Sequence, residues 1–185
     1  MKSLIVTPCG DKKAAEPTIA RLLYRSPRIR AVYARRANRD FGILSAVKQA
    51  LAKLGRPPHE IAVISGIGCA GKLPHYIGTY GLHTLHGRAL NVATGVKLAN
   101  QDLEVLVAGG DGDGYGIGAG YFVNSGRRNV NFAYLVHNNG VYGLTKGQFS
   151  ATADRKSPSK RGAFPREESI DLCGMALELG ASFVA

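Results

Sequence analysis

The sequence is poor in cysteine, in acidic residues and in long apolar runs. Its three cysteines are scattered over 185 residues, which indicates a reducing compartment rather than a disulfide framework. No apolar run approaches the roughly 18 residues that a membrane helix needs, and the N-terminus lacks the apolar stretch of a signal peptide. We therefore expect a cytoplasmic protein with no membrane partner, built around a single core.

Basic residues outnumber acidic ones by 24 to 13, and they concentrate at the N-terminus. We interpret residues 1–38 as a basic extension, with a short strand over Met1–Cys9 and an amphipathic stretch over Thr18–Arg36. Such a patch can bind nucleic acid or an acidic protein surface. It can equally be the solvated face of a helix. We favour the solvated face, so we do not expect nucleic acid to be a partner.

The glycine-rich loop Gly66–Gly71 lacks what two common phosphate motifs require. It follows an apolar strand predicted over Ile61–Ser65 and fits the pattern GxGxxG, but no acidic residue lies within the next 30 positions to bind a ribose hydroxyl. With Lys72 it also fits the start of a P-loop, yet Leu73 stands where a serine or threonine must hold magnesium. A P-loop NTPase is therefore a minor alternative.

Two apolar runs further along the chain predict buried strands. Leu103–Gly110 and Val130–Val136 are rich in β-branched residues and have no polar face, which is typical of strands covered on both sides. Between them, Tyr115–Arg128 is long enough for a crossover helix, and Ala89–Ala99 has an apolar helical pattern. The sequence thus predicts an α/β fold with a mostly parallel sheet and helices on both faces.

Oxygen ligands follow each of the two predicted strands. Asp111 lies in the run Gly110–Gly114, and Asn139 follows 28 residues later. Because ligands bind beyond the carboxyl ends of parallel strands, both side chains are expected at one edge of the sheet. Asp111, Asn139 and the carbonyl of Val141 would offer three oxygens to Mg²⁺, and the glycines would let backbone N–H groups approach a diphosphate.

Simpler interpretations of the same run are ordinary turn chemistry and a calcium loop. Aspartate and glycine are common where a strand turns into a helix, with no ligand involved. An EF-hand is excluded because Tyr115 and Phe122 stand where oxygen ligands are required. The second polar site at Asn139 favours a magnesium site over a plain turn.

The spacing from GDG to the asparagine pair resembles the thiamine diphosphate motif. The stretch from Asp40 to Thr152 more specifically resembles the β subunit of archaeal and bacterial 2-oxoacid:ferredoxin oxidoreductases, of the pyruvate or 2-oxoglutarate type. The matching segments follow the order of that family and read DFGIL, SGIGCAGKLPHY, TYGLHTLHGRAL, VATGVKLAN, GGDGDGYGIG and NNGVYGLTKGQ.

This resemblance implies a thiamine diphosphate-binding fold, with thiamine diphosphate and Mg²⁺ as cofactors. It also implies oxidative decarboxylation of a 2-oxoacid, with coenzyme A as acceptor and ferredoxin as electron carrier. An α subunit is the implied partner, because in this family that subunit provides the glutamate that activates the cofactor. The glutamates of this chain lie in no comparable setting.

The resemblance further assigns roles to particular residues. Lys72, Lys146 and His83 are implied at the substrate, coenzyme A or diphosphate and are our candidate catalytic residues, although a surface lysine and a solvated histidine are the simpler alternatives. The candidate cofactor-binding residues are Gly68, Cys69, His86, Gly87, Gly110, Asp111, Gly112, Asp113, Asn139, Val141, Gly143, Leu144 and Thr145, of which Asp111, Asn139 and Val141 also form the candidate metal site.

The chain departs from this family at its iron–sulfur ligands. Arg35–Asn38 replaces a CPGC motif that supplies two cluster thiolates in the family, and Cys69 is left as one of four ligands. We expect Cys173 to be a buried helix residue. We also expect the domain 39–185 to be C-terminally truncated after a final strand, Ala181–Ala185.

These departures leave two other functions open. One is a catalytically silent cofactor-binding or assembly module, which the missing thiolates favour. The other is a nucleic-acid or acidic-partner binder that uses the basic N-terminal segment. Ser150–Glu168, which is rich in serine, lysine, arginine and proline, is the expected mobile loop over the site.

Overall fold

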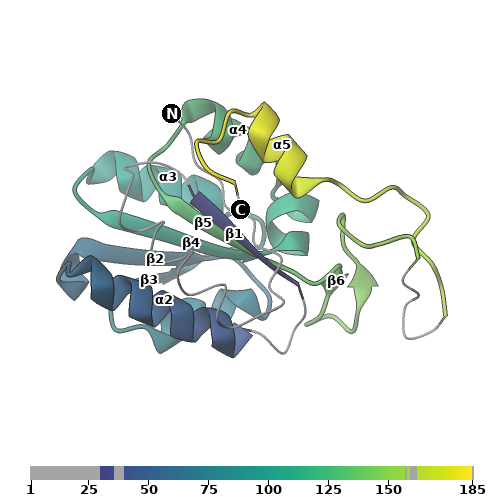
Figure 1. The fold of residues 1–185 in the computed structure, drawn as a ribbon, viewed down its shortest axis with the longest axis horizontal. Coiled ribbons are helices and arrows are strands. Elements are labelled where there is room, and N and C mark those ends of the chain that lie inside the picture. Colours follow the sequence, from purple (N-terminus) through teal and green to yellow (C-terminus); the bar gives the residue numbers. More distant parts are fainter. Residues whose placement is uncertain (1–29, 36–39, 157, 159–161, 185) are drawn as a thin grey trace.

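The computed structural model describes residues 30–35, 40–156, 158 and 162–184 (Figure 1). Its centre is a five-stranded sheet in which every pair of neighbouring strands is parallel. The order across the sheet is β1 (Arg30–Arg35), β5 (Ala133–Asn138), β4 (Glu104–Gly110), β2 (Ile61–Ser65) and β3 (Tyr80–His83).

Three of the four α-helices connect these strands, and a small hairpin follows β5. The α-helices are α2 (Asp40–Leu54), α3 (Ala89–Ala99), α4 (Ala119–Arg128) and α5 (Leu172–Glu178). Shorter turns of helix are the 3₁₀ segments η2 (Pro58–Glu60) and η3 (Ala70–Tyr76) and the π-helical segment η4 (Gly112–Ile117). The hairpin pairs β6 (Val141–Tyr142) with β7 (Gln148–Phe149).

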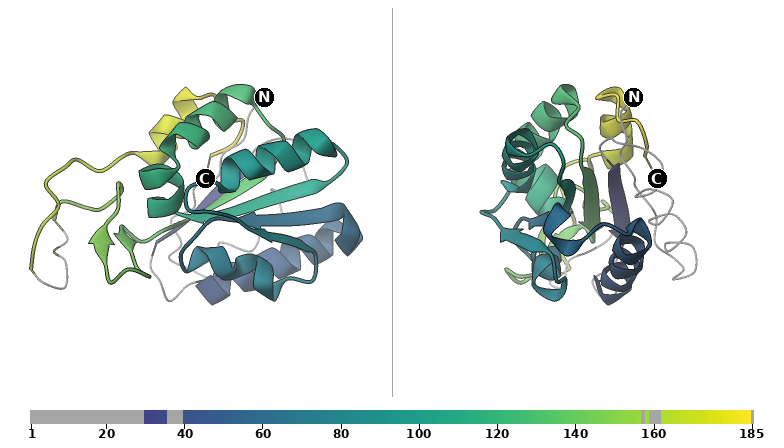
Figure 2. Two further views of the ribbon diagram at one scale, coloured as in Figure 1. Left: turned by 180° about the vertical axis from the view of Figure 1, so that it is seen from behind. Right: turned by 90° about the vertical axis from the view of Figure 1, so that its left-hand side faces the viewer.

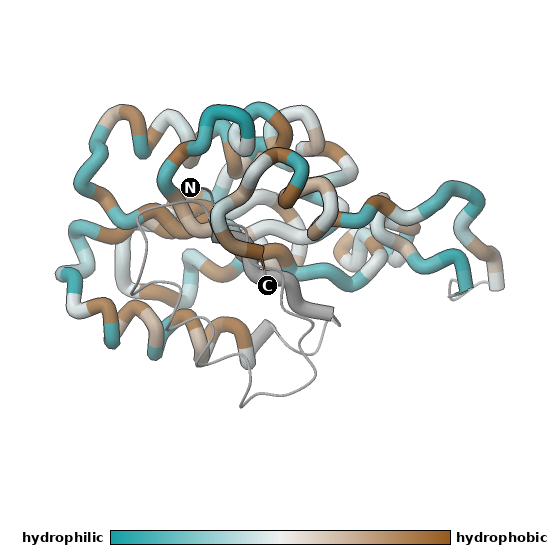
Figure 3. The backbone as a smooth tube through the Cα atoms, turned by 45° about the horizontal axis from the view of Figure 1, so that its top comes forward, coloured by the Kyte–Doolittle hydropathy of each residue, from teal (hydrophilic) through white to brown (hydrophobic). Residues whose placement is uncertain are grey.

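Side chains of the central strands point alternately into two apolar clusters, one on each face of the sheet. In β4, Val105 and Val107 belong to the cluster that α3, α4 and α5 cover, whereas Leu106 and Ala108 belong to the cluster that α2 covers. Figure 2 shows these helices on opposite sides of the sheet. In Figure 3, where the chain is coloured by residue hydropathy, hydrophobic residues lie in the strands between them. Full burial of each such valine or leucine contributes about 1.5–3 kcal/mol. The predicted α/β fold with helices on both faces is confirmed.

Two predicted elements are shifted or divided. The strand predicted over Val130–Val136 begins only at Ala133, because Asn129 ends α4 in the left-handed conformation and Phe132 N–H then bonds to the Val130 carbonyl. The helix predicted over 115–128 is divided at Gly118, whose N–H reaches five residues back to the Asp113 carbonyl at 2.9 Å. This π-type bond ends η4 before α4 begins.

The ends of the domain differ from the prediction as well. Backbone of Arg30–Arg35 pairs in parallel with β5, so the sheet includes residues that we had placed in the N-terminal extension, and a helical face is wrong for them. The strand predicted over Met1–Cys9 lies outside the described residues. Ala181–Ala185 is not a strand in its described part, 181–184, where Val184 makes a single β bridge.

None of the helices in these described ranges is both long enough and apolar enough to cross a membrane.

Candidate functional site

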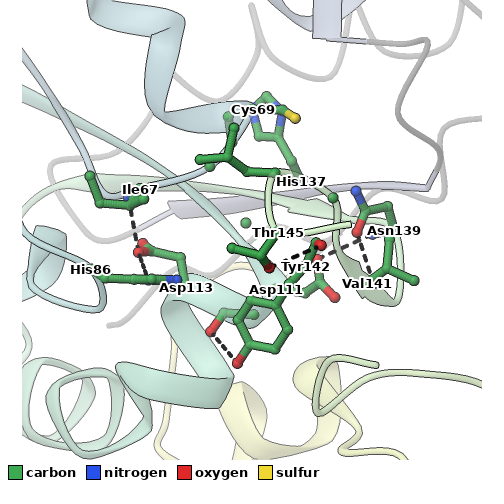
Figure 4. Close-up of a pocket in the computed structure, with 16 residues that line it drawn as sticks. Ile67, Cys69, His86, Asp111, Asp113, His137, Asn139, Val141, Tyr142 and Thr145 are labelled. Carbon is green, nitrogen blue, oxygen red and sulfur yellow. Dashed lines mark hydrogen bonds and ion pairs between the residues drawn. The ribbon is translucent and has the colours of Figure 1, made fainter. Parts of the chain in front are cut away.

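Loops from the carboxyl ends of β2, β4 and β5 meet at one pocket, joined by His86 from the loop after β3 (Figure 4). Its lining contains twelve of the thirteen predicted cofactor-binding residues, all except Gly87. The lining residues are Ile67, Gly68, Cys69, Ala70, His86, Gly110, Asp111, Gly112, Asp113, His137, Asn139, Val141, Tyr142, Gly143, Leu144 and Thr145.

Asp111 is buried at the end of β4, and the two oxygens of its carboxylate have unequal environments. Its exposed fraction is 1%. Oδ2 accepts hydrogen bonds from the Gly140 N–H at 3.1 Å, from the Thr152 hydroxyl at 2.7 Å and from the Ser150 hydroxyl. From the residues that the structure describes, Oδ1 accepts a single bond, of 3.2 Å from the Asn139 N–H. Oδ1 therefore retains the capacity to bind a cation.

The other two predicted metal ligands lie in the turn that receives Asp111. The Asn139 side-chain oxygen accepts the Val141 N–H at 3.0 Å, which is an Asx turn that holds residues 139–141 against the pocket. Figure 4 shows this bond beside Asp111. No group of three histidine, cysteine or acidic side chains gathers to hold a metal anywhere in the described ranges. A cation here would bind one carboxylate with neutral oxygens, as Mg²⁺ does.

Asp113, which we expected to contact the cofactor, lines the pocket and also joins the loops after β2 and β3 to its own segment. Its Oδ1 accepts the Ile67 N–H at 3.0 Å, the Gly87 N–H at 2.8 Å and His86 Nδ1 at 2.7 Å. The opposite oxygen lies so close to Gly66 that a Cβ on this glycine would stand 1.8 Å from it. Only glycine at position 66 lets the β2 loop approach this carboxylate, which is 3% exposed.

Asp113 also orients His86. Because the carboxylate accepts the proton on Nδ1, the imidazole is held in one orientation at the pocket wall, where its other nitrogen is available to a ligand. The ring meets Tyr142 edge-on with centroids 5.9 Å apart.

Tyr142 is a pocket residue that sequence reasoning missed. Its hydroxyl donates to the Gly112 carbonyl at 3.1 Å, and its ring packs so closely on η4 that a Cβ at Gly112 would stand 2.5 Å from it. Burial, and then the negative charges of Asp111 and Asp113, raise the pKa of Tyr142. The phenol therefore stays protonated and can donate its hydrogen bond.

The candidate catalytic residues Lys72 and His83 line a second cavity that adjoins the first. The Ser65 hydroxyl donates to the Gly71 carbonyl at 2.7 Å, so it must accept the contact at 3.1 Å from His83 Nδ1. Nδ1 is therefore the donor in this contact, and Nε2 takes no part in it. Cys69 lines both cavities and is exposed.

Two predicted residues lie apart from the pocket linings. Lys146 is exposed in the turn between β6 and β7 and lines neither cavity; its φ of 80° is one that glycine usually adopts. Gly87 lines neither cavity, but its N–H holds Asp113. A catalytic role of Lys146 therefore stays a prediction, and an exposed lysine without such a role is its alternative.

The segment 150–168, expected to be mobile, begins as part of the site. Ser150 is buried, and both it and Thr152 bond to the Asp111 carboxylate. Sequence reasoning missed both residues, because no spacing rule relates a serine to an aspartate 39 positions earlier.

The second described cysteine, Cys173, lines neither cavity. Cys173 packs in α5 against the apolar cluster under α3 and α4, and burial raises the pKa of its thiol. It is partly buried, in agreement with the prediction of a helix core residue. Cys69 is thus the only cysteine at the pocket within the described ranges.

The glutamates of the described ranges are also absent from both cavity linings. Glu60 and Glu104 lie at the amino ends of β2 and β4, at the opposite edge of the sheet, and pair with Arg56 at 2.8 and 3.4 Å. Glu168 pairs with Arg155 in the segment 150–168.

Comparison with known proteins decides the family. Residues 59–185 match the family model described as thiamine pyrophosphate enzyme, C-terminal TPP binding domain. The chain belongs to this family. The family residues include β2, β4, β5 and every residue of both cavities except Leu44. The cavities therefore belong to a thiamine pyrophosphate-binding domain.

Several relatives of this domain are β subunits, as the sequence resemblance predicted. The β subunit of 2-oxoacid:ferredoxin oxidoreductase from Saccharolobus solfataricus is 54% identical over 149 residues, which are 79% of this chain and 49% of that protein. Subunit KorB of Mycobacterium tuberculosis 2-oxoglutarate oxidoreductase is 47% identical over 115 residues, 62% of this chain and 31% of that protein. This chain spans about half the length of the first of these relatives.

A solved structure shares both fold and sequence. It is the 2-oxoglutarate:ferredoxin oxidoreductase from Magnetococcus marinus with 2-oxoglutarate, coenzyme A and succinyl-CoA bound. The TM-score is 0.74 and the identity 45%, over 77% of this chain and 49% of that chain. The sequence resemblance to this family of β subunits is confirmed.

Replacing Asp113 by alanine should destabilise the fold, because three donors would lose their common acceptor. Each buried donor left without a partner costs about 1–3 kcal/mol, and water can satisfy some of them, so we expect the free energy of unfolding to fall by roughly 3 kcal/mol. Urea denaturation followed by circular dichroism measures this change. The control is Asp102→Ala at an exposed turn, and an equal effect of the two substitutions would contradict the assigned role of Asp113.

Proposed function

We propose that the pocket binds thiamine diphosphate with Mg²⁺, and that Asp111 is the charged ligand of the metal. The observation that carries this proposal is the unequal bonding of the Asp111 carboxylate, in which Oδ2 has three donors and Oδ1 has one long bond. Asn139 and Val141 line the same pocket. The remaining positions around Mg²⁺ would go to diphosphate oxygens and water.

The pocket offers an anion further polar groups. Backbone at Gly110 and Gly112 lines it, and His86 is held at its wall as a donor or acceptor. When bound, thiamine diphosphate supplies the nucleophilic carbon and the electron sink for decarboxylation. The protein would bind and orient it, and Lys72 and His83 in the adjoining cavity would be available to a carboxylate or acyl group of a substrate.

We further infer that the chain acts as a subunit in the oxidative decarboxylation of a 2-oxoacid, with coenzyme A and ferredoxin. The sequence identity of 54% and 47% to two such subunits, from Saccharolobus solfataricus and Mycobacterium tuberculosis, supports this reaction. An α subunit would complete the site, because neither cavity has a glutamate in its lining from the described residues. General acid–base assistance from such a partner is typically worth about 10² to 10⁴ in rate.

Mg²⁺ and thiamine diphosphate together should raise the melting temperature of the chain, and Asp111→Ala should abolish the shift. At a hundredfold excess over the dissociation constant, binding stabilises a protein by about 2.7 kcal/mol. Differential scanning fluorimetry measures the shift. Because Asp111→Ala also removes the acceptor of several buried donors, Asp111→Asn is the second variant, and it should keep the fold but lose most of the shift. Equal shifts in all three proteins would contradict the metal assignment.

A catalytically silent module is the second candidate, and the shortage of thiolates favours it. Arg35–Asn38 replaces the CPGC motif, and Cys173 packs in the core. A four-iron cluster takes four thiolate ligands, so Cys69 cannot complete one alone.

The full chain, reconstituted anaerobically with iron and sulfide, should therefore hold less than one four-iron cluster per monomer. Chemical analysis of iron and sulfide, together with the visible absorption spectrum, would measure the number of clusters per monomer. A stoichiometric cluster would show that other thiolates complete the site and would restore electron transfer to this chain.

A further inference from the structure

We propose that Ser150 and Thr152 are positioning residues for the metal ligand: they hold Oδ2 of Asp111 so that Oδ1 is presented to the cation. The proposal rests on the proposed function. Neither residue lines the pocket, and both lie 39 or more positions from the aspartate in sequence.

Side-chain hydroxyls provide two of the three donors to Oδ2. Ser150 donates to it through a short contact, and Thr152 Oγ1 lies 2.7 Å away. Thr152 Oγ1 also lies 2.7 Å from the Asn138 side-chain oxygen, so its single proton is shared between two acceptors at the ends of β4 and β5. The two hydroxyls are 3.1 Å apart and form one polar cluster with the carboxylate.

Backbone hydrogen bonds fix the segment that carries these hydroxyls. The Ser150 N–H bonds to the Gly140 carbonyl at 3.1 Å, the Ala153 N–H bonds to the Ser150 carbonyl at 3.1 Å, and the Ile170 N–H bonds to the Ala151 carbonyl at 2.8 Å. Ser150 follows β7 directly, and Ala153 is buried. Backbone on both sides therefore holds the hydroxyls in place.

The two hydroxyls restrict rotation of the Asp111 carboxylate. The terminal torsion of an aspartate side chain is broad and nearly two-fold, so a carboxylate without fixed partners can rotate and exchange its oxygens. Backbone N–H groups of Asn139 and Gly140 contact one oxygen each and do not by themselves distinguish them. The two hydroxyls add unequal bonding and thereby select Oδ1 for the metal.

The test compares Mn²⁺ binding by the full chain and its variants in the presence of thiamine diphosphate, with free Mn²⁺ measured by electron paramagnetic resonance. In S150A/T152V, the dissociation constant for Mn²⁺ should rise by about 10- to 100-fold, the usual effect of removing a hydrogen-bond partner of a metal ligand. S150T/T152S keeps both hydroxyls and should recover most of the affinity.

The matched control is T94V/S125A. Thr94 and Ser125 are a second hydroxyl pair, 3.3 Å apart between α3 and α4, with no contact to Asp111. The dissociation constant of T94V/S125A for Mn²⁺ should equal that of the parent chain. Its free energy of unfolding, measured without metal, gives the cost of removing a pair of hydroxyls that does not contact Asp111.

The outcomes separate this inference from the proposed function. If the parent chain binds no Mn²⁺ with thiamine diphosphate present, the proposed function fails. If the parent chain binds Mn²⁺ and S150A/T152V binds it equally well, or loses only stability to the same extent as T94V/S125A, then Ser150 and Thr152 do not position the metal ligand.

Discussion

Two buried carboxylates at the end of β4 are the constraint on which the rest of the site depends. Asp111 and Asp113 are 1% and 3% exposed, and a buried charge is costly unless donors surround it. The loops after β2, β3 and β5, together with the segment after β7, supply these donors. The same hydrogen bonds that satisfy the charges therefore bring together loops from distant parts of the sequence.

The two aspartates have different roles. Asp113 has its Oδ1 occupied by three donors and acts as a structural junction that orients His86. Asp111 has one oxygen with a single hydrogen bond from the described residues, and Asn139 and Val141 line the same pocket. A site built in this way offers one negative charge to a cation and leaves room for an anionic ligand to provide the rest, as a magnesium diphosphate does.

Much of this arrangement could be predicted from the sequence, because it follows local pattern. The apolar run Ile61–Ser65 and the helical pattern Ala89–Ala99 coincide with β2 and α3. The parallel sheet then brings Asp111 and Asn139 to one edge, and the backbone N–H of Asn139 contacts Asp111. Strand periodicity and the geometry of parallel sheets are sufficient for these features.

Other features depend on tertiary contacts that no local pattern encodes. Arg30–Arg35 is basic, and only pairing with β5 makes it a strand. Tyr142 is a pocket residue because glycines of η4 allow its ring to approach. In the sequence Ser150 belongs to a polar segment, and only the folded structure places it beside Asp111. Asp113 lines the pocket, but its bonds to the loops after β2 and β3 follow from no sequence pattern.

The glutamates of the described residues lie outside both cavity linings. Glu60 and Glu104 lie at the far edge of the sheet, and this chain spans about half the length of relatives such as the Saccharolobus solfataricus β subunit.

The most direct test is a crystal structure of the chain grown with thiamine diphosphate and Mn²⁺, with anomalous scattering recorded to locate the metal. We expect one strong anomalous peak, coordinated by Asp111 Oδ1, the Asn139 side-chain oxygen and the Val141 carbonyl, with diphosphate density alongside. Cofactor bound at another place, or Mn²⁺ bound without Asp111, would contradict it.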